Sequence, residues 1–426
     1  MRKHLVFGVG LVLLSLVVAG GLWIPIAPQN VAMVALPVSR MVACPVPNDS
    51  VGSTTVMLAD QEPFTTLDLL TGEKSSPTTG ATIEEATSVI IARGSASLGG
   101  YSRYVGPSGE MAAPCAPAIT WGAWNGVNTE VGSPVFLLTN VDEVSAVVDV
   151  HIFGETGPIT RPGLSDMSVS PGELVVINLK TYEITSETPI TVVIRATKGR
   201  VSAMLRVEGD QGSHWQLPQT AADTDLIIAG IPAGFSERLL SITNTDPTQR
   251  AVVSLSILGE NGTFEPLVGD SFEVGPARTK TIDITQWLGG QASGLHLVSD
   301  LPITATMVLA GAGFSGISPQ PALGGELVFP PVEGTLWLAN PSDEAVSIFI
   351  KAETEDSAEA SELEIPAGYV RSIPFPGEGI SVLMVTTSMA LRASLHLGGD
   401  SLSILPLWGG GAAFSVSVPA LDPGLG

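Results

Sequence analysis

The residues that could carry out chemistry are sparse in this chain and lie far apart. The sequence contains two cysteines and five histidines, which are His4, His151, His214, His296 and His396. No two histidines have the spacing of metal ligands, and two cysteines are too few for a Cys-rich zinc site. The Gly-x-Ser-x-Gly elbow of lipases is missing. We therefore predict no metal site, no cofactor and no catalytic residues, with a Ser-His-Asp triad assembled from distant segments as the remaining route to a hydrolase.

Carboxylates are the second kind of residue to consider, because a glycosidase needs two that face each other. Acidic residues are dense in three places, namely Glu84-Glu85, Asp223 with Asp225, and Glu353 with Glu355 and Asp356. All three lie in predicted loops, where neighbouring acids are usually solvated charge. Weak calcium binding at a joint between units is the alternative, although the full oxygen-ligand pattern of a calcium loop is missing.

The segment Gly311–Gly316 has the Gly-x-Gly-x-x-Gly spacing of a dinucleotide fingerprint. That fingerprint requires a helix directly afterwards, because the helix N-terminus binds the pyrophosphate. The residues that follow include Pro319 and Pro321, which argue against a helix. We interpret the segment as a turn between strands.

Three tryptophans near predicted joints are the candidates for a ligand platform. Trp121 and Trp124 lie shortly after Cys115, and Trp215 lies near the following joint. Exposed aromatic rings on a β-sheet can stack on sugars or on a partner protein. The alternative is that these rings fill the core or the spaces between domains.

Charge limits the partners of the protein. Lys and Arg number 19 against 42 Asp and Glu, so the net charge is −23, and such a chain repels the phosphates of nucleic acid. A hydrophobic content of 44% excludes a disordered chain. The length of 426 residues predicts several domains.

The N-terminus predicts a membrane segment. Arg2 and Lys3 precede an uncharged run of 22 residues from Leu5 to Ile26. As a helix this run would span about 33 Å, enough to cross a hydrocarbon core of about 30 Å. The basic residues place the N-terminus in the cytoplasm and the rest of the chain outside. A cleaved signal peptide, which would leave a secreted protein, is the alternative.

Three stretches of the chain resemble one another, which predicts repeated units. Their openings, VFLLTN, LLSITN and LWLAN, end in Asn140, Asn244 and Asn340. A turn follows each, which suits asparagine because its side chain can bond its own backbone. Residues 146–152 then alternate in polarity, and this period of two predicts a half-buried strand with His151 on the solvent face.

The units continue in a common order. Pro171 and Gly275 begin turns, and each follows its asparagine by 31 positions. A Pro-Ile-Thr motif begins a later strand at Pro189 and at Pro302. We interpret the acidic segment 352–364 as a loop or hairpin tip between two strands.

The predicted fold is all-β, with tandem immunoglobulin-like β-sandwich units behind a single N-terminal transmembrane helix. Such a tandem would form a stiff arm. The predicted boundaries are a signal-anchor or signal peptide at 1–28, a degenerate N-terminal β unit at 29–118, and β-sandwich units at 119–218, 219–322 and 323–426.

Cys44 opens the degenerate unit and Cys115 follows its last predicted strand. Two lone cysteines of an exported chain are expected to pair, and two buried thiols are the alternative. A disulfide would clamp the two ends of that unit.

These motifs also resemble a known group of proteins. The PCAP around Cys115, the WGAW that follows, and the junction from HWQLP to LLSITN are similar to a domain-of-unknown-function family of secreted actinobacterial proteins. The resemblance covers most of the chain after Cys44. It implies export and a β-sandwich fold, and it implies no activity and no functional residues.

The sequence thus favours a non-enzymatic, membrane-anchored extracytoplasmic scaffold or interaction protein of the cell envelope. Envelope proteins or cell-wall glycan are the expected partners. An envelope glycan-binding protein that uses the three tryptophans is one alternative. A cryptic hydrolase is the other.

Overall fold

Antiparallel β-strands make up nearly all of the regular structure in the computed structural model of the protein. The residues that the structure describes are 41–44, 51–58, 65–68, 73–74, 81–83, 88–91, 98–106, 109–130, 132–209, 212–266, 271–310, 314–323, 325–329, 333–353, 358–375, 380–385, 391–397 and 403–406. Among them the one helix is a short 3-10 turn, η1 (Leu179–Tyr182). The predicted all-β class is therefore confirmed.

The strands fall into four groups that share one pairing pattern. When the seven main strands of a group are counted along the chain, the first, fifth and third pair in that order and form sheet I. The fourth, second, sixth and seventh pair in that order and form sheet II. Group 1 consists of β1 (Met41–Ala43), β2 (Val51–Leu58), β3 (Thr65–Asp68), β4 (Ala81–Ile83), β5 (Ser88–Ile91), β6 (Leu98–Gly106) and β7 (Gly109–Pro114).

Group 2 repeats this pattern and adds two short strands beside its third strand. Its main strands are β9 (Trp121–Val127), β10 (Ser133–Thr139), β11 (Ala146–Gly154), β14 (Leu174–Asn178), β15 (Ile190–Lys198), β16 (Val201–Gly209) and β17 (Gly212–Gln216). The short strands β12 (Gly157–Ile159) and β13 (Met167–Val169) pair with β11.

Groups 3 and 4 complete the series. Group 3 consists of β18 (Asp223–Ile231), β19 (Glu237–Asn244), β20 (Ala251–Gly259), β23 (Arg278–Asp283), β24 (Ser293–Ala310) and β25 (Phe314–Ile317), with the short strands β21 (Gly262–Phe264) and β22 (Ser271–Val274) beside β20. Group 4 consists of β26 (Gly325–Phe329), β27 (Gly334–Ala339), β28 (Val346–Glu353), β30 (Val370–Phe375), β31 (Ile380–Val385), β32 (Arg392–Leu397) and β33 (Ser403–Pro406), with β29 (Ala358–Ile365) beside β28.

The long strand β24 supplies both the fifth and the sixth strand of group 3. Its first half pairs with β18 and β20, and its second half pairs with β19 and β25. Pro302 therefore precedes the half of β24 that lies in sheet II, whereas Pro189 precedes β15 in sheet I. The predicted equivalence of the two Pro-Ile-Thr motifs is therefore wrong. The fifth and sixth strands have similar patterns of apolar and polar residues, so a motif of three residues does not show which of the two strands it precedes.

Three buried asparagines close the same corner in groups 2, 3 and 4. The Oδ1 atoms of Asn140, Asn244 and Asn340 accept hydrogen bonds from backbone N–H groups two residues later, at 3.0 to 3.1 Å. Each Nδ2 donates to a carbonyl four or five residues later and to another at the end of a strand across the corner. The expected bonding of these side chains to local backbone is confirmed, and it extends to a second chain segment.

The turns opposite these asparagines require a positive φ angle. Gly172 and Gly368 both have φ near 72°, and their N–H groups donate to the carbonyls of Asn140 and Asn340. Group 3 uses Ala277, with φ of 47°, and its N–H donates to the carbonyl of Asp246. A Cβ atom in this region costs about 1–2 kcal/mol.

Replacement of Ala277 by glycine is therefore expected to stabilise the protein by about 1 kcal/mol. Chemical denaturation monitored by tryptophan fluorescence measures the change. Gly172→Ala is the reciprocal control and should destabilise by a similar amount, because no atom of the described residues lies within 4 Å of the added Cβ and only the backbone cost applies. A loss of stability in Ala277→Gly would show that this turn is not strained.

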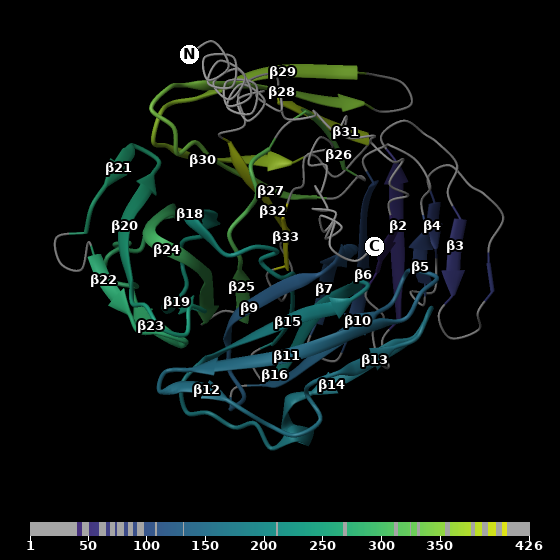
Figure 1. Cartoon of the computed structure of the whole chain (residues 1–426). Helices are drawn as coiled ribbons and strands as arrows, with labels where there is room; N and C mark the ends of the chain where they lie inside the picture. The colour runs from purple at the N-terminus through teal and green to yellow at the C-terminus, as the bar shows by residue number, and fades with distance from the viewer. Residues whose placement is uncertain are drawn as a thin grey trace, which may run out of the picture. The chain divides into compact units, whose positions relative to one another are not determined.

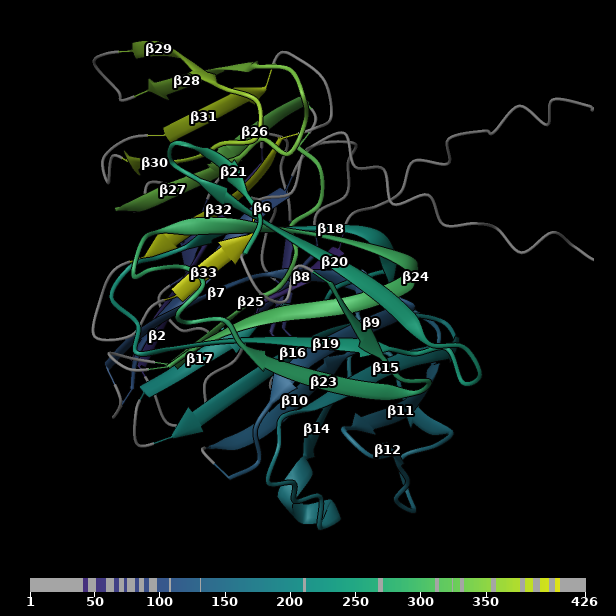
Figure 2. The same ribbon diagram turned by 90° about the vertical axis from the view of Figure 1, so that its left-hand side faces the viewer.

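The groups contact one another in a closed series. Strand β9 contacts β19 and β24, β18 contacts β27 and β32, and β26 contacts β2 and β6. Among the seventh strands, β17 contacts β7, β25 and β33, and β33 contacts β7 and β25; β33 lies beside β7 and β25 in Figures 1 and 2. The N–H of Ala112 in group 1 donates to Ser403 Oγ of group 4 at 2.9 Å. Contacts therefore also join groups 1 and 4, which are not neighbours in the sequence.

By its contacts the segment from Ser39 to Gly426 is one compact unit. Each of groups 2, 3 and 4 nevertheless has its own apolar core between its two sheets. Tyr101 and Ala112 of group 1 join the core of group 4. The division into four sandwich units at the boundaries named above stays a prediction.

Candidate functional site at the joints between the strand groups

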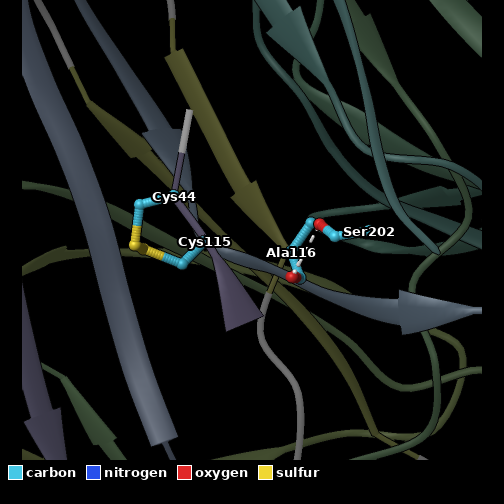
Figure 3. Close-up of a disulfide and its surroundings, with 4 residues drawn as sticks. All are labelled: Cys44, Cys115, Ala116 and Ser202. Carbon is cyan, nitrogen blue, oxygen red and sulfur yellow. Dashed lines mark hydrogen bonds between the residues drawn. A yellow bond between two sulfur atoms is a disulfide. The ribbon is translucent and has the colours of Figure 1, made fainter. Parts of the chain in front are cut away.

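A disulfide lies at the joint between groups 1 and 2. Cys44 directly follows β1, and Cys115 directly precedes β8 (Ala116–Ile119). Strand β8 pairs with β1 on one edge and with β16 on the other, so it joins sheets of the two groups. Figure 3 shows the disulfide beside the hydrogen bond in which Ser202 Oγ donates to the carbonyl of Ala116 at 3.0 Å. The predicted pairing of the cysteines is confirmed.

Buried hydroxyl groups line the joint between groups 2 and 3. Thr243 Oγ1 lies 2.5 Å from Thr191 Oγ1 and 2.9 Å from Thr279 Oγ1. Thr279 Oγ1 donates its only proton to the carbonyl of Phe153. Thr243 must therefore donate to Thr279, and Thr191 must donate to Thr243. All three side chains are buried, so this chain of bonds fixes the two groups in one geometry.

Asn125 extends the same network from the first strand of group 2. Its Nδ2 donates to Thr243 Oγ1 at 3.0 Å and to the carbonyl of Thr304 at 3.1 Å, and the residue is completely buried. The next residue, Gly126, has φ of 75°, and a Cβ there would lie 2.3 Å from Val308 Cγ2. Group 3 therefore comes so close to β9 that a side chain does not fit.

At the joint between groups 3 and 4 a glycine again lets the backbone of one group lie close to the other group, but the side chains involved differ. Gly230, with φ of 78°, lies against Trp337, and an added Cβ would be 2.5 Å from the Cγ atom of the indole. Ser394 Oγ donates to the carbonyl of Ala229 across the joint at 3.0 Å and lies 3.0 Å from His396 Nε2. The ring of His396 lies 5.7 Å from that of Trp337.

The tautomer of His396 follows from these bonds. Since the hydroxyl of Ser394 donates to the carbonyl of Ala229, its oxygen accepts a hydrogen bond from the Nε2–H group of His396. The Nδ1 atom is buried and has no hydrogen-bond partner among the described residues, so a second proton would have no acceptor there. Burial lowers the pKa of His396 to about 3, and burial lowers the pKa of His214 on β17 to about 3 as well.

The stability of the protein should consequently fall as the pH drops from 6.5 towards 3. In that window the unfolded chain binds protons on these histidines and the folded chain does not, so each contributes a slope of about 1.4 kcal/mol per pH unit. His396→Gln should remove one such slope from the free energy of unfolding measured by denaturation at several pH values. His151→Gln, at an exposed position on β11, is the control and should leave the slope in place.

The acidic pair of group 3 is engaged in charge interactions. Asp225 Oδ1 lies 2.9 Å from His296 Nε2. Burial lowers the pKa of Arg392, while the carboxylates of Asp225 and Asp223 act in the opposite direction. No group of three or more His, Cys, Asp or Glu in the described residues could hold a metal ion. Glu84, Glu85, Glu355 and Asp356 lie outside the described residues, as does the side chain of Glu353.

Ser256, His296 and Asp225 occupy three neighbouring strands. Ser256 pairs with His296 in the register between β20 and β24. In a Ser-His-Asp triad the serine hydroxyl is hydrogen-bonded to the histidine that activates it. No such hydrogen bond joins the Ser256 hydroxyl to the His296 ring. His151 is exposed on β11, as predicted.

The three candidate tryptophans lie at or near joints. Trp124 is completely buried, and its Nε1 donates to the carbonyl of Gln216 at 2.9 Å. Trp215 is 6% exposed and stacks near the guanidinium of Arg206. Trp121, on the same strand as Trp124, is partly exposed. The packing alternative thus describes Trp124 and Trp215, and Trp121 is the most exposed of the three.

The structure describes part of the fingerprint-like segment and none of the N-terminal apolar run. Residues 314–317 form β25, which pairs with β24, so the second half of the fingerprint-like segment is strand and not the turn that the sequence predicted. Residues 311–313 and the apolar run from Leu5 to Ile26 lie outside the described residues. Within the part that the structure describes, no helix has the length and apolar character needed to cross a membrane.

Sequence reasoning missed the residues that build the joints. The spacing of these residues gives no signal, because Thr243 lies 52 positions after Thr191 and 118 positions after Asn125 in the chain. No sequence signal marks these three residues, and Thr279, a partner of Thr243, is only one of three threonines in the segment 279–285.

Comparison with known proteins gives one family and no function. A model described as "Family of unknown function (DUF5719)" matches residues 106–316. The match runs from the end of β6 to β25 and so spans groups 2 and 3 with the disulfide residue Cys115. A search of curated proteins finds no match.

Proposed function

We propose that the protein is a non-enzymatic scaffold or interaction protein of the cell envelope. It is exported, and residues 1–28 hold it at the membrane while the β groups lie outside. The disulfide between Cys44 and Cys115 supports export, because disulfides persist in oxidising compartments and are rare in the cytosol. The net charge of −23 supports protein or glycan partners over nucleic acid.

The observation that carries the scaffold proposal is the construction of the joints. A hydroxyl network, a tryptophan seated against a glycine, and a disulfide each connect one pair of groups. Directional bonds of this kind hold groups in a fixed arrangement. A protein whose role is to present several surfaces at set distances requires such an arrangement.

The finer description of the fold belongs to the same proposal. We infer that the groups are tandem immunoglobulin-like units of a secreted actinobacterial type. The repeated pairing pattern supports tandem units. The family description assigns no activity, so it neither adds nor removes a function.

Glycan binding remains the second proposal and now depends on Trp121. Trp124 and Trp215 are buried, and their replacement would unfold the joints rather than remove a platform. Trp121→Ala is therefore the sharper test, with loss of carbohydrate pull-down as the expected result. Retained binding would remove the three-tryptophan platform from consideration.

In-cell cross-linking of the tagged protein, followed by mass spectrometry and glycan analysis, tests the scaffold proposal. Specific envelope proteins should be enriched over a tag-only control, with linked lysines that identify the group in contact. Co-purification of polysaccharide alone would contradict the scaffold and favour glycan binding. Protease treatment of cells with a permeable envelope should digest the β groups, and their protection would contradict the topology.

A further inference from the structure

The outer edge of sheet I is built differently in group 4 than in groups 2 and 3. In groups 2 and 3 the third strand is bordered by two short strands, which are three residues long in β12 and β13 and three and four residues long in β21 and β22. In group 4 the border is a single strand of eight residues, β29. Short, broken edge strands are a common protection against unwanted pairing, and group 4 lacks it.

The sequence explains the difference. Pro162 and Gly163 separate β12 from β13, and Pro266 and Gly269 separate β21 from β22. The segment that forms β29, AEASELEI, contains neither proline nor glycine. Its register with β28 runs without a shift from Val346↔Ile365 to Glu353↔Ala358. Strand β29 is therefore regularly pleated along its length, as a strand must be if another strand is to pair with its edge.

The free side of β29 is open among the described residues. Strand β29 ends the order β26-β31-β28-β29, and no other described strand pairs with it. Figures 1 and 2 show it as the outermost strand of this sheet. Ser361, Glu362 and Glu364 are exposed on it. Unpaired N–H and C=O groups along such an edge are a template for an extended segment.

The charges on this edge select the occupant. Glu362 and Glu364 project from one face of the strand, since they are two residues apart, and Glu362 pairs with the partly exposed Phe349 of β28. A second copy of β29 would bring glutamates against glutamates, which is unfavourable. Lysine or arginine at alternate positions of an incoming strand would instead form opposite-charge pairs across it.

We propose that the edge of β29 is a docking site for an extended basic segment of a partner protein, which adds as a strand to sheet I of group 4. The proposal rests on the interaction role proposed above and names the chemistry of the partner. Main-chain hydrogen bonds to β29 supply affinity, and Glu362 and Glu364 favour an incoming strand with basic side chains. Phe349 supplies an apolar contact on the same face.

The test uses the purified full chain and three eight-residue probes with blocked ends. One alternates valine with lysine, one alternates valine with glutamate, and one alternates proline with lysine. The proline peptide has the charge of the first but cannot form a strand ladder, because proline lacks an N–H. Fluorescence anisotropy should show that the valine–lysine peptide binds at least about tenfold more tightly than either control.

Hydrogen exchange and charge variants place the binding. The valine–lysine peptide should slow exchange of amides in β29 and leave β12 and β21 unaffected. Glu362→Lys/Glu364→Lys should weaken binding at least about tenfold, whereas Glu155→Lys/Glu187→Lys changes exposed glutamates of group 2 by the same charge and should not. Equal binding of the two lysine peptides, equal loss in both variants, or a dimer that itself protects β29 would overturn the proposal.

Failure here is distinguishable from failure of the scaffold role. If cross-linked envelope proteins are unchanged in Glu362→Lys/Glu364→Lys, the scaffold stands and the β29 site falls. If no partner is cross-linked to the wild type, the scaffold falls whatever the peptides do.

Discussion

Gly230→Ala should lower the free energy of unfolding by about 2–5 kcal/mol and loosen the joint between groups 3 and 4. Two costs add at this position. The residue has φ of 78°, where a Cβ costs about 1–2 kcal/mol. The new atom would also lie 2.5 and 2.6 Å from Cγ and Cβ of Trp337, and these atoms next to the backbone cannot swing away as a flexible chain end would. Overpacking of this kind costs about 1–3 kcal/mol.

A matched control separates the two costs. Gly172 has φ of 72° and nothing within 4 Å of an added Cβ, so Gly172→Ala carries only the backbone cost. Chemical denaturation gives the difference between the variants, and hydrogen exchange in β18 and β27 shows where it acts. If both variants lose the same stability, the close approach of Trp337 to Gly230 does not hold in solution.

Removal of the disulfide should produce the second large effect. Cys44 and Cys115 are 71 positions apart, and closing a loop of that length in the unfolded chain corresponds to about 4 kcal/mol in the chain-entropy treatment. We expect Cys44→Ser/Cys115→Ser to lose a stability of this order. The loss should appear as faster hydrogen exchange in β1 and β8, since those strands flank the bridge.

Reduction provides the control for that result. Dithiothreitol should destabilise the wild type by a similar amount and leave Cys44→Ser/Cys115→Ser unchanged, because the variant has no cysteine left. A reductant effect of equal size in both proteins would mean that the lost stability has another origin. A variant as stable as the oxidised wild type would mean that β1 and β8 are held by their pairing alone.

These two effects test the feature on which the scaffold proposal depends. Each change weakens one joint and leaves the apolar core within each group intact. If cross-linking to envelope partners is lost along with joint stability, the fixed arrangement of the groups contributes to binding. If it persists, single groups are sufficient to bind.

The local features of this chain could be predicted from its residues. Alternating polarity in the segment 146–152 specifies a strand, because successive side chains of a strand point to opposite faces. The corner asparagines were recognisable because their bonds run to backbone two to five residues away. The pairing of Cys44 with Cys115 followed from the count of cysteines and the predicted export. The prediction of a loop or hairpin tip at 352–364 was wrong for most of that segment, because residues 352–353 belong to β28 and residues 358–364 to β29.

The arrangement of the groups was decided by tertiary structure. Trp124 and Trp215 looked suitable for a platform because an aromatic residue in a strand has the same sequence pattern whether its face is open or covered. Thr243 belongs to the joint because its hydroxyl bonds to Thr191 and Thr279. The hydrogen bond between Ala112 and Ser403 joins residues 291 positions apart. The sequence by itself determined strand polarity, turns and the disulfide, which depend on neighbouring residues or on composition. Only the tertiary structure decided which sheet faces are buried, because that depends on the register of segments that meet through packing rather than through the chain.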